Sequence, residues 1–148
     1  MSGARTQVGI VEWARRARSA RTLERQIAAV LGDAIPGAMQ PGVKLLLARH
    51  ARHFAWHGDL WDGLVPTLHD VSVDDPPRPL ADVEDVHVEN VYFANVYVEV
   101  VPRLTATYRA WGVEATPVAE RPVLRVLDLV LRDLDFDAGE AQRLLGAR

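Results

Sequence analysis

Apolar residues divide the chain into four long amphipathic blocks. The breaks between the blocks are rich in proline and glycine, and they fall at Pro36–Gly37, at Pro41–Gly42, and in residues 66–79 and 112–117. Within each block, apolar side chains recur every three or four positions, as they do on one face of an α-helix. The pattern therefore predicts four long helices, at residues 7–34, 42–65, 81–111 and 119–146.

The third block allows a second interpretation. It is rich in valine and tyrosine, and the segment Val96–Val100 alternates in polarity as a β-strand would. A strand is therefore the alternative for this segment. A stripe of apolar residues with helical spacing favours the helix: Val86, Phe93, Tyr97, Val100, Leu104, Tyr108 and Trp111. Pro102 is expected to kink that helix, because proline removes one intrahelical hydrogen bond.

The composition is typical of one globular domain. The chain has 148 residues, of which 49% are hydrophobic and 25% are charged, so residues 1–148 are expected to form a single domain. It contains no cysteine, which excludes disulfides, thiolate catalysis and cysteine-ligated metals. Because no apolar run is long enough to cross a membrane and the N-terminus lacks a secretory signal, we expect a cytoplasmic protein.

Charge is distributed unevenly along the chain. Residues 1–57 contain nine Lys or Arg residues and three acidic residues, a local charge of +6, whereas the whole chain carries −3. The arginines of the first predicted helix spread around it and lack a set of aromatic residues that could stack on bases. This arrangement favours a solvated or acid-pairing helix face over a nucleic-acid site.

Polar side chains interrupt the apolar faces of the predicted helices. Three of the chain's five histidines lie on the core-facing side of the second helix: His50, His53 and His57. Glu24 lies near the middle of the apolar face of the first helix, Glu89 lies close to that of the third, and Asp137 lies toward that of the fourth. We therefore expect imidazoles from one helix to meet carboxylates from its neighbours inside the protein.

The axial positions of these groups constrain the topology. Glu24, His50, Glu89 and Asp137 each lie about eight to ten residues from a helix end, so they would meet about 15 Å below one end of a bundle. This requires the second and third helices to run parallel, joined by a crossover along the length of the bundle. The connection at residues 66–81 extends to about 50 Å, whereas a helix of this length measures about 38 Å. The predicted architecture is an all-α four-helix bundle with a long crossover between helices two and three.

In this architecture the chain resembles the ferritin-like superfamily of four-helix bundles. That family places a Glu on helices one and three, and a Glu-x-x-His pair on helices two and four, around two metal ions. Glu24 and Glu89 match the single carboxylates, and His50-x-x-His53 matches the pair with His in place of Glu. The fourth helix offers Asp133-x-x-Phe136 or Asp137-x-x-Glu140, which lack the expected histidine.

The resemblance implies a small non-haem iron oxidoreductase or oxygenase, with dioxygen or a small molecule as its substrate. Its implied metal ligands are Glu24, His50, His53 and Glu89. His57 and Asp137 are the expected catalytic residues, as further ligands or as proton carriers. Imidazole and carboxylate donors suit manganese or zinc as well as iron.

Two metal-free alternatives explain the same polar residues. In the first, Glu24 orients a histidine as a general base, and Tyr92 or Tyr97 donates a hydrogen bond in an apolar cavity. In the second, the bundle is an interaction or accessory subunit, and its polar cluster is a closed structural network. Glu24 and Asp137 would then accept hydrogen bonds from His50 and His53.

Apolar residues also fall on the outer faces of two predicted helices. Leu45 and Trp56 share the outer face of the second helix, and Val91 and Val98 share that of the third. Such a surface stays uncovered after one bundle forms, and a second copy of the chain would cover it. We therefore expect a homodimer.

Overall fold

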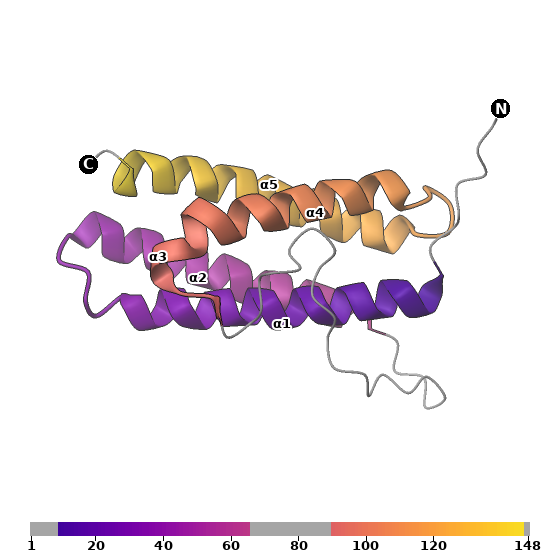
Figure 1. The fold of residues 1–148 in the computed structure, drawn as a ribbon, viewed down its shortest axis with the longest axis horizontal. Coiled ribbons are helices and arrows are strands. Elements are labelled where there is room, and N and C mark those ends of the chain that lie inside the picture. The colour runs from indigo at the N-terminus through magenta and orange to yellow at the C-terminus, as the bar shows by residue number, and fades with distance from the viewer. Residues whose placement is uncertain (1–8, 66–89, 147–148) are drawn as a thin grey trace.

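The computed structural model describes residues 9–65 and 90–146, and its regular elements in those ranges are all helical (Figure 1). The elements are α1 (Ile10–Ala34), α2 (Pro41–Asp62), α3 (Phe93–Asn95), the π-helical segment η3 (Val96–Val100), α4 (Val101–Glu114) and α5 (Arg121–Leu145). Because α3, η3 and α4 follow one another without a break, the described chain forms four rods. The all-α class and the helical bundle are confirmed, and Val96–Val100 is helical rather than a strand.

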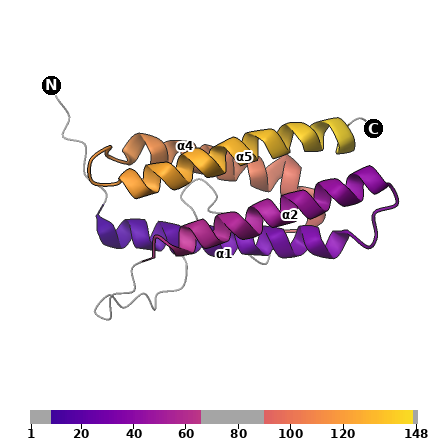
Figure 2. The ribbon, with the colours of Figure 1, turned by 180° about the vertical axis from the view of Figure 1, so that it is seen from behind.

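The helix directions are the same in both ribbon views. Helices α1 and α2 run antiparallel, as do α4 and α5, whereas α2 and α4 point the same way (Figures 1 and 2). Helix α1 packs on α2, α2 packs on α5, and α5 packs on α4. As a result, α2 and α5 are antiparallel neighbours, and side chains at matching spacings on the two helices face one another.

Three of the four predicted helices lie within about three residues of their expected bounds, and prolines help to set them. Pro41 opens α2, and Pro122 lies in the first turn of α5, where a missing backbone N–H costs no hydrogen bond. The third helix differs from the prediction, because Asn90, Val91 and Tyr92 do not continue it. The Asn95 side chain accepts a hydrogen bond from the Tyr92 N–H and donates one to the Asn90 carbonyl, which fixes a turn there.

Several predictions fall on parts of the chain outside the described residues. Glu89, the helical turns predicted at residues 81–89 and the connection predicted at residues 66–81 all belong to this group. Among the described residues, no helix combines the length and the apolar character needed to cross a membrane.

The core forms where the apolar stripes of the four rods meet. Fully buried aliphatic and aromatic side chains come from every rod, and they include Ile27, Leu31, Leu46, Phe54, Leu104 and Leu134. Burial of each such side chain contributes about 1.5–3 kcal/mol, so the stripes fix the rotation of each helix about its axis. That rotation turns the polar residues within the stripes toward the interior.

The π-helical segment η3 marks an irregularity directly before Pro102. The N–H of Val101 bonds to the carbonyl of Val96, five residues earlier, instead of four. Pro102 has no N–H to donate to the preceding turn, so a regular α-helical ladder is interrupted here in any case. The extra residue leaves Val98 exposed while Tyr97, half-buried, faces the other helices.

Candidate functional site

Three histidines stack along the face of α2 that points into the bundle. The ring centroids of His50 and His53 are 6.3 Å apart, those of His53 and His57 are 6.5 Å apart, and the rings are nearly parallel. His50 and His57 have no exposed surface, whereas 32% of the His53 side chain is exposed. The prediction that these histidines face the core is confirmed for His50 and His57, and His53 lies at its border.

Carboxylates from α5 face these histidines in register. Asp133, Asp137 and Glu140 are spaced by four and three residues, which is the spacing of His57, His53 and His50 read backwards. Because α2 and α5 are antiparallel neighbours, each of the three histidines contacts one of these carboxylates at 2.8–3.0 Å. A ladder of imidazole–carboxylate pairs therefore joins the two helices.

The deeper end of the ladder is a fully bonded cluster, here called the inner cluster. It consists of Glu24, His57, Asp133, Trp61 and Tyr108. Nδ1 of His57 lies 2.9 Å from Glu24, and Nε2 lies 2.8 Å from Asp133. The other oxygen of Glu24 accepts hydrogen bonds from the Trp61 indole at 2.6 Å and from the Tyr108 hydroxyl at 2.9 Å. Every polar group of this cluster is satisfied.

The geometry of the inner cluster requires a charged imidazole. Both ring nitrogens of His57 face carboxylates, which are acceptors only, so both nitrogens carry hydrogen. Burial lowers the pKa of His57, but the hydrogen bonds and charges of Glu24 and Asp133 outweigh it, and the pKa lies above its ordinary value of 6.5. Burial and the charge of Glu24 hold the pKa of Tyr108 well above 10, so this hydroxyl stays protonated and donates.

The other end of the ladder is a chain of three groups, here called the relay: Tyr97, His50 and Glu140. The Tyr97 hydroxyl lies 2.6 Å from Nδ1 of His50, and Nε2 of His50 lies 3.0 Å from Glu140. Burial opposes ionisation of Glu140, but hydrogen bonds from Arg49 and His50 lower its pKa below the ordinary value. Glu140 is therefore a carboxylate, and 13% of its side chain is exposed.

The relay contains a neutral imidazole with a defined tautomer. Burial lowers the pKa of His50 below 6.5, and the nearby carboxylates of Asp137 and Glu140 offset this only in part. Since Glu140 can only accept, Nε2 of His50 carries the hydrogen and Nδ1 accepts the Tyr97 hydroxyl. Burial, followed by the charges of Asp137 and Glu140, raises the pKa of Tyr97 well above 10, which keeps that hydroxyl protonated.

Asp137 lies between the relay and His53. Its carboxylate is 2.8 Å from Nδ1 of His53 and 3.4 Å from Nε2 of His50. Burial raises the pKa of Asp137, and the two histidines counter this only in part. In the metal-free network expected from the sequence, Glu24 and Asp137 accept from His50 and His53; in the structure Asp137 lies beside both histidines, whereas Glu24 contacts His57.

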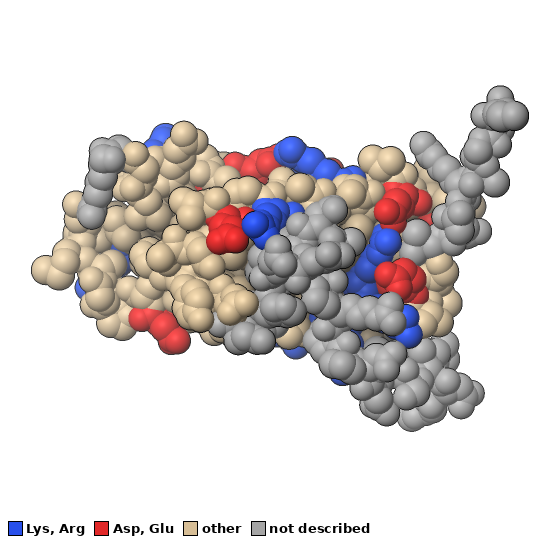
Figure 3. Space-filling model, viewed as in Figure 1, with Lys and Arg blue, Asp and Glu red and all other residues tan. Residues whose placement is uncertain are grey.

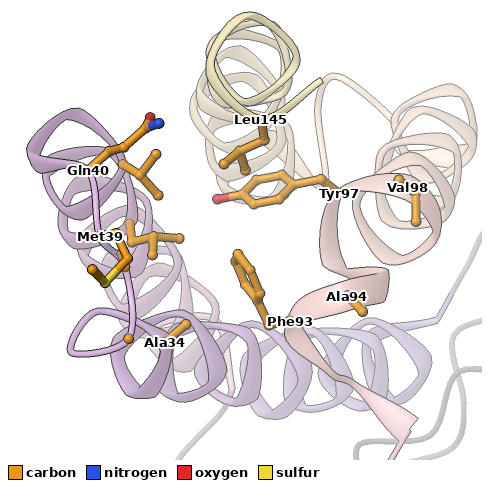
Figure 4. Close-up of a pocket in the computed structure, with 12 residues that line it drawn as sticks. Ala34, Met39, Gln40, Phe93, Ala94, Tyr97, Val98 and Leu145 are labelled. Carbon is orange, nitrogen blue, oxygen red and sulfur yellow. The ribbon is translucent and has the colours of Figure 1, made fainter. Parts of the chain in front are cut away.

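An apolar pocket of about 670 Å³ opens beside the relay (Figure 4). It lies among α1, α2, α3, η3 and α5, and Phe93, Val98 and Leu145 contribute to its apolar lining. Tyr97 lines the pocket, and in Figure 4 its ring extends into the space between α2 and α5. Tyr97, whose hydroxyl contacts His50, therefore forms part of the wall of a cavity large enough for a small molecule.

The predicted set of four metal ligands does not come together among the described residues. Glu24 contacts His57, Trp61 and Tyr108, the pair His50 and His53 faces α5, and Glu89 lies outside the described residues. Both nitrogens of His50 already contact hydrogen-bonding partners. Across residues 9–65 and 90–146, no group of three or more His, Asp or Glu residues is arranged to hold a metal ion. The donors have the right chemistry for iron, but their arrangement fits a hydrogen-bonded network.

Several residues have a different position or role in the structure from the one that the sequence predicts. Tyr97 reaches a histidine, but Tyr92 is 60% exposed and lines no part of the pocket. Val91 was expected on an outer face and is instead 3% exposed, because the chain there is not helical and turns into the core. In the prediction from the sequence, Asp133 and Glu140 stand only in the motifs Asp133-x-x-Phe136 and Asp137-x-x-Glu140, with no histidine partner assigned. The reversed match between their spacing and that of the histidines is the signal that identifies them.

Basic side chains of α1 are paired with acids of other helices. Arg16 bonds to Glu114 of α4, and Arg25 lies 3.2 Å from Asp59 of α2. On the face shown in Figure 3, blue and red side chains lie next to one another. This pairing agrees with the expectation that the basic first segment faces acids of its own chain.

Comparison of the chain with protein-family models, with curated proteins and with solved structures gives no match. The geometry of the relay, the inner cluster and the pocket is therefore the basis for a functional proposal.

Proposed function

We propose that the protein is a small helical enzyme that transfers a proton to or from a substrate bound in the pocket beside Tyr97. One observation carries the proposal: the Tyr97 hydroxyl at the pocket wall lies 2.6 Å from the neutral imidazole of His50. A neutral imidazole with an acceptor nitrogen is an effective general base near neutral pH. The π-helical segment that carries Tyr97 adds support, because such segments are frequent at functional sites.

Proton transfer along the relay is balanced at each group. The substrate gives its proton to the Tyr97 oxygen, the Tyr97 proton passes to Nδ1 of His50, and the Nε2 proton of His50 passes to Glu140. Tyr97 and His50 each gain one proton as they lose another, so neither buried group changes its charge. Glu140 is the partly exposed end of the relay and exchanges its proton with water.

The proposal is tested with a neutral apolar probe, 5-nitrobenzisoxazole, whose ring opens when a base removes its carbon-bound proton. The wild-type protein is expected to open it with saturation kinetics, and His50→Asn is expected to lose that activity while keeping its helical circular dichroism. Equal rates for the two proteins would overturn the proposal. The cluster would then be structural, and the bundle would act as an interaction or accessory subunit.

A metal-dependent oxidoreductase, with iron, manganese or zinc, is the second candidate function. The specific observation in its favour is the proximity of unlike donor atoms: Nε2 of His50 lies 3.0 Å from Glu140 and 3.4 Å from Asp137. Imidazole with carboxylates is the donor chemistry of such centres. Because the described residues do not fit a metal site as they stand, we derive no step through an ion.

Metal content separates the two candidates. If the second is correct, protein purified without a tag or added metal contains close to one equivalent of a transition metal, and added Fe²⁺ or Mn²⁺ raises its Tm. His53→Ala would then lose the metal and stay folded. Less than about a tenth of an equivalent, together with an unchanged Tm, would remove the metal-dependent candidate.

A ferritin-like topology remains part of the proposal. In Figure 1, α2 ends toward the end of the bundle where α1 begins, whereas α3 begins nearer the opposite end. We propose that the connection at residues 66–81 is the long crossover along the bundle that the resemblance implies. Homodimer formation also stays a prediction, and the exposure of Leu45, Trp56 and Val98 supports it.

A further inference from the structure

The pocket beside the relay has an almost entirely apolar wall. Two of its lining side chains, Gln40 and Tyr97, carry polar groups, and the others are alanine, glycine, valine, leucine, methionine or phenylalanine. None of the residues that line it is Lys, Arg or His. An anionic ligand would lose its hydration here without meeting a cation, which is costly.

Two carboxylates near the pocket also disfavour an anionic ligand. Asp137 and Glu140 are carboxylates of α5 that face His50, at 3.4 Å and 3.0 Å from its Nε2. Their negative charge also acts on Tyr97, which lines the pocket, whereas Arg49, the cation that pairs with Glu140 at 2.6 Å, is not among the lining residues. The pocket therefore favours an uncharged ligand over an anion of the same shape.

The hydrogen bond of Tyr97 defines what the ligand must offer. Its hydroxyl hydrogen is directed at Nδ1 of His50, so the oxygen presents lone pairs to other partners. In Figure 4 the Tyr97 side chain points between α2 and α5 from the wall of the pocket. A ligand hydroxyl can donate to that oxygen, whereas an ether oxygen of the same size would meet another acceptor.

We infer that the pocket takes an uncharged, largely apolar alcohol or phenol whose hydroxyl donates a hydrogen bond to Tyr97. This inference rests on the proposed function, since it uses the same Tyr97 oxygen that accepts the substrate proton there. A volume of about 670 Å³ accommodates a molecule of two or more fused rings or a medium-length chain.

Three naphthalene probes of similar shape test the inference: 2-naphthol donates a hydrogen bond, 2-methoxynaphthalene does not, and 2-naphthoate is an anion. Isothermal titration calorimetry on the wild type should show 2-naphthol binding about tenfold more tightly than either of the others. Tyr97→Phe should remove the preference for 2-naphthol over 2-methoxynaphthalene and keep the preference over 2-naphthoate. The matched variant Tyr92→Phe makes the same chemical change at an exposed tyrosine outside the pocket and should keep both preferences.

Three other outcomes would each overturn a different part of the inference. Equal affinity for 2-naphthol and 2-methoxynaphthalene would remove the donor requirement, and tighter binding of 2-naphthoate would remove the preference for uncharged ligands. Absence of 2-naphthol binding would remove the pocket as its site. The proposed function fails separately, because it fails when 5-nitrobenzisoxazole turnover is independent of His50, whatever the naphthalene probes do.

Discussion

Replacement of His57 by alanine is expected to lower the free energy of unfolding by about 3–5 kcal/mol. Glu24 has no exposed surface, and this substitution removes the cation that contacts one of its oxygens at 2.9 Å. Trp61 and Tyr108 still donate to the other oxygen, but neither carries a charge to balance the carboxylate. Urea unfolding followed by circular dichroism at pH 7 measures the loss.

Two further variants separate the buried charge from general packing. His53→Ala removes an imidazole that is one-third exposed. Its buried partner Asp137, whose pKa burial already raises, can take up a proton instead of staying charged, so the loss should be smaller than for His57→Ala. Glu24→Gln combined with His57→Ala should recover part of the lost stability, because no buried charge is left unpaired. Equal losses for His57→Ala and His53→Ala, with no recovery in the double variant, would contradict the charged inner cluster.

The pH dependence of the His57 contribution has a defined sign. The pKa of His57 in the folded protein lies above the ordinary value of 6.5, so folding favours its protonated form. The stabilisation is therefore fully present below about pH 6.5 and is lost as the pH rises through the folded-state pKa. The difference in unfolding free energy between wild type and His57→Gln should shrink on going from pH 6 to pH 9.

Replacement of Tyr97 by phenylalanine is expected to lower kcat/KM for 5-nitrobenzisoxazole by about 10²- to 10⁴-fold. The substitution keeps the ring at the pocket wall and removes the oxygen that connects the pocket to His50 at 2.6 Å. The probe still binds, but no group at the wall accepts its proton. Steady-state absorbance kinetics on the folded variant measure the loss.

The matched control for this experiment is Tyr92→Phe. Tyr92 is 60% exposed and lies outside the pocket lining, so its variant should keep the wild-type rate. The wild-type rate should also rise as the pH passes the lowered pKa of His50, below 6.5, and stay level above it. A Tyr97→Phe rate within twofold of wild type would show that the proton leaves by another route.

The four rods of the bundle were predictable from the spacing of the apolar residues. Apolar residues that recur every three or four positions give each helix one apolar face, which packs against a core. The prolines at the starts of α2 and α5 made those ends predictable as well. The start of α3 was not predictable in the same way. It depends on side-chain hydrogen bonds of Asn95 that override the apolar stripe running through Val91.

The presence of a buried histidine–carboxylate cluster was predictable from helix faces, but its pairing was not. A helical wheel places Glu24 and the three histidines inside, yet it contains no information on how far α1 and α5 slide along α2. That offset decides that Glu24 meets His57 rather than His50. The match between the spacings of Asp133, Asp137 and Glu140 and those of the histidines supplies the offset of α5, once antiparallel packing is known.

The contact of Tyr97 with His50 was only partly predictable. The apolar stripe of the third predicted helix contains Tyr97 and not Tyr92, so the pattern points Tyr97 toward the core. It does not contain the contact between the Tyr97 hydroxyl and His50, or the π-helical hydrogen bonding of the segment that carries Tyr97. The pocket beside it is likewise a product of packing and has no signature in the pattern.

A ¹⁵N NMR titration of the three α2 histidines tests the central claim most directly, because it reports the charge and tautomer of each ring. We predict that His50 is neutral at pH 7 with its hydrogen on Nε2, and that the pKa of His57 lies above 6.5 and above that of His50. In Tyr97→Phe, the Nδ1 signal of His50 should shift because its donor is gone. A charged His50 at pH 7, or a pKa of His57 below that of His50, would contradict the relay and the inner cluster.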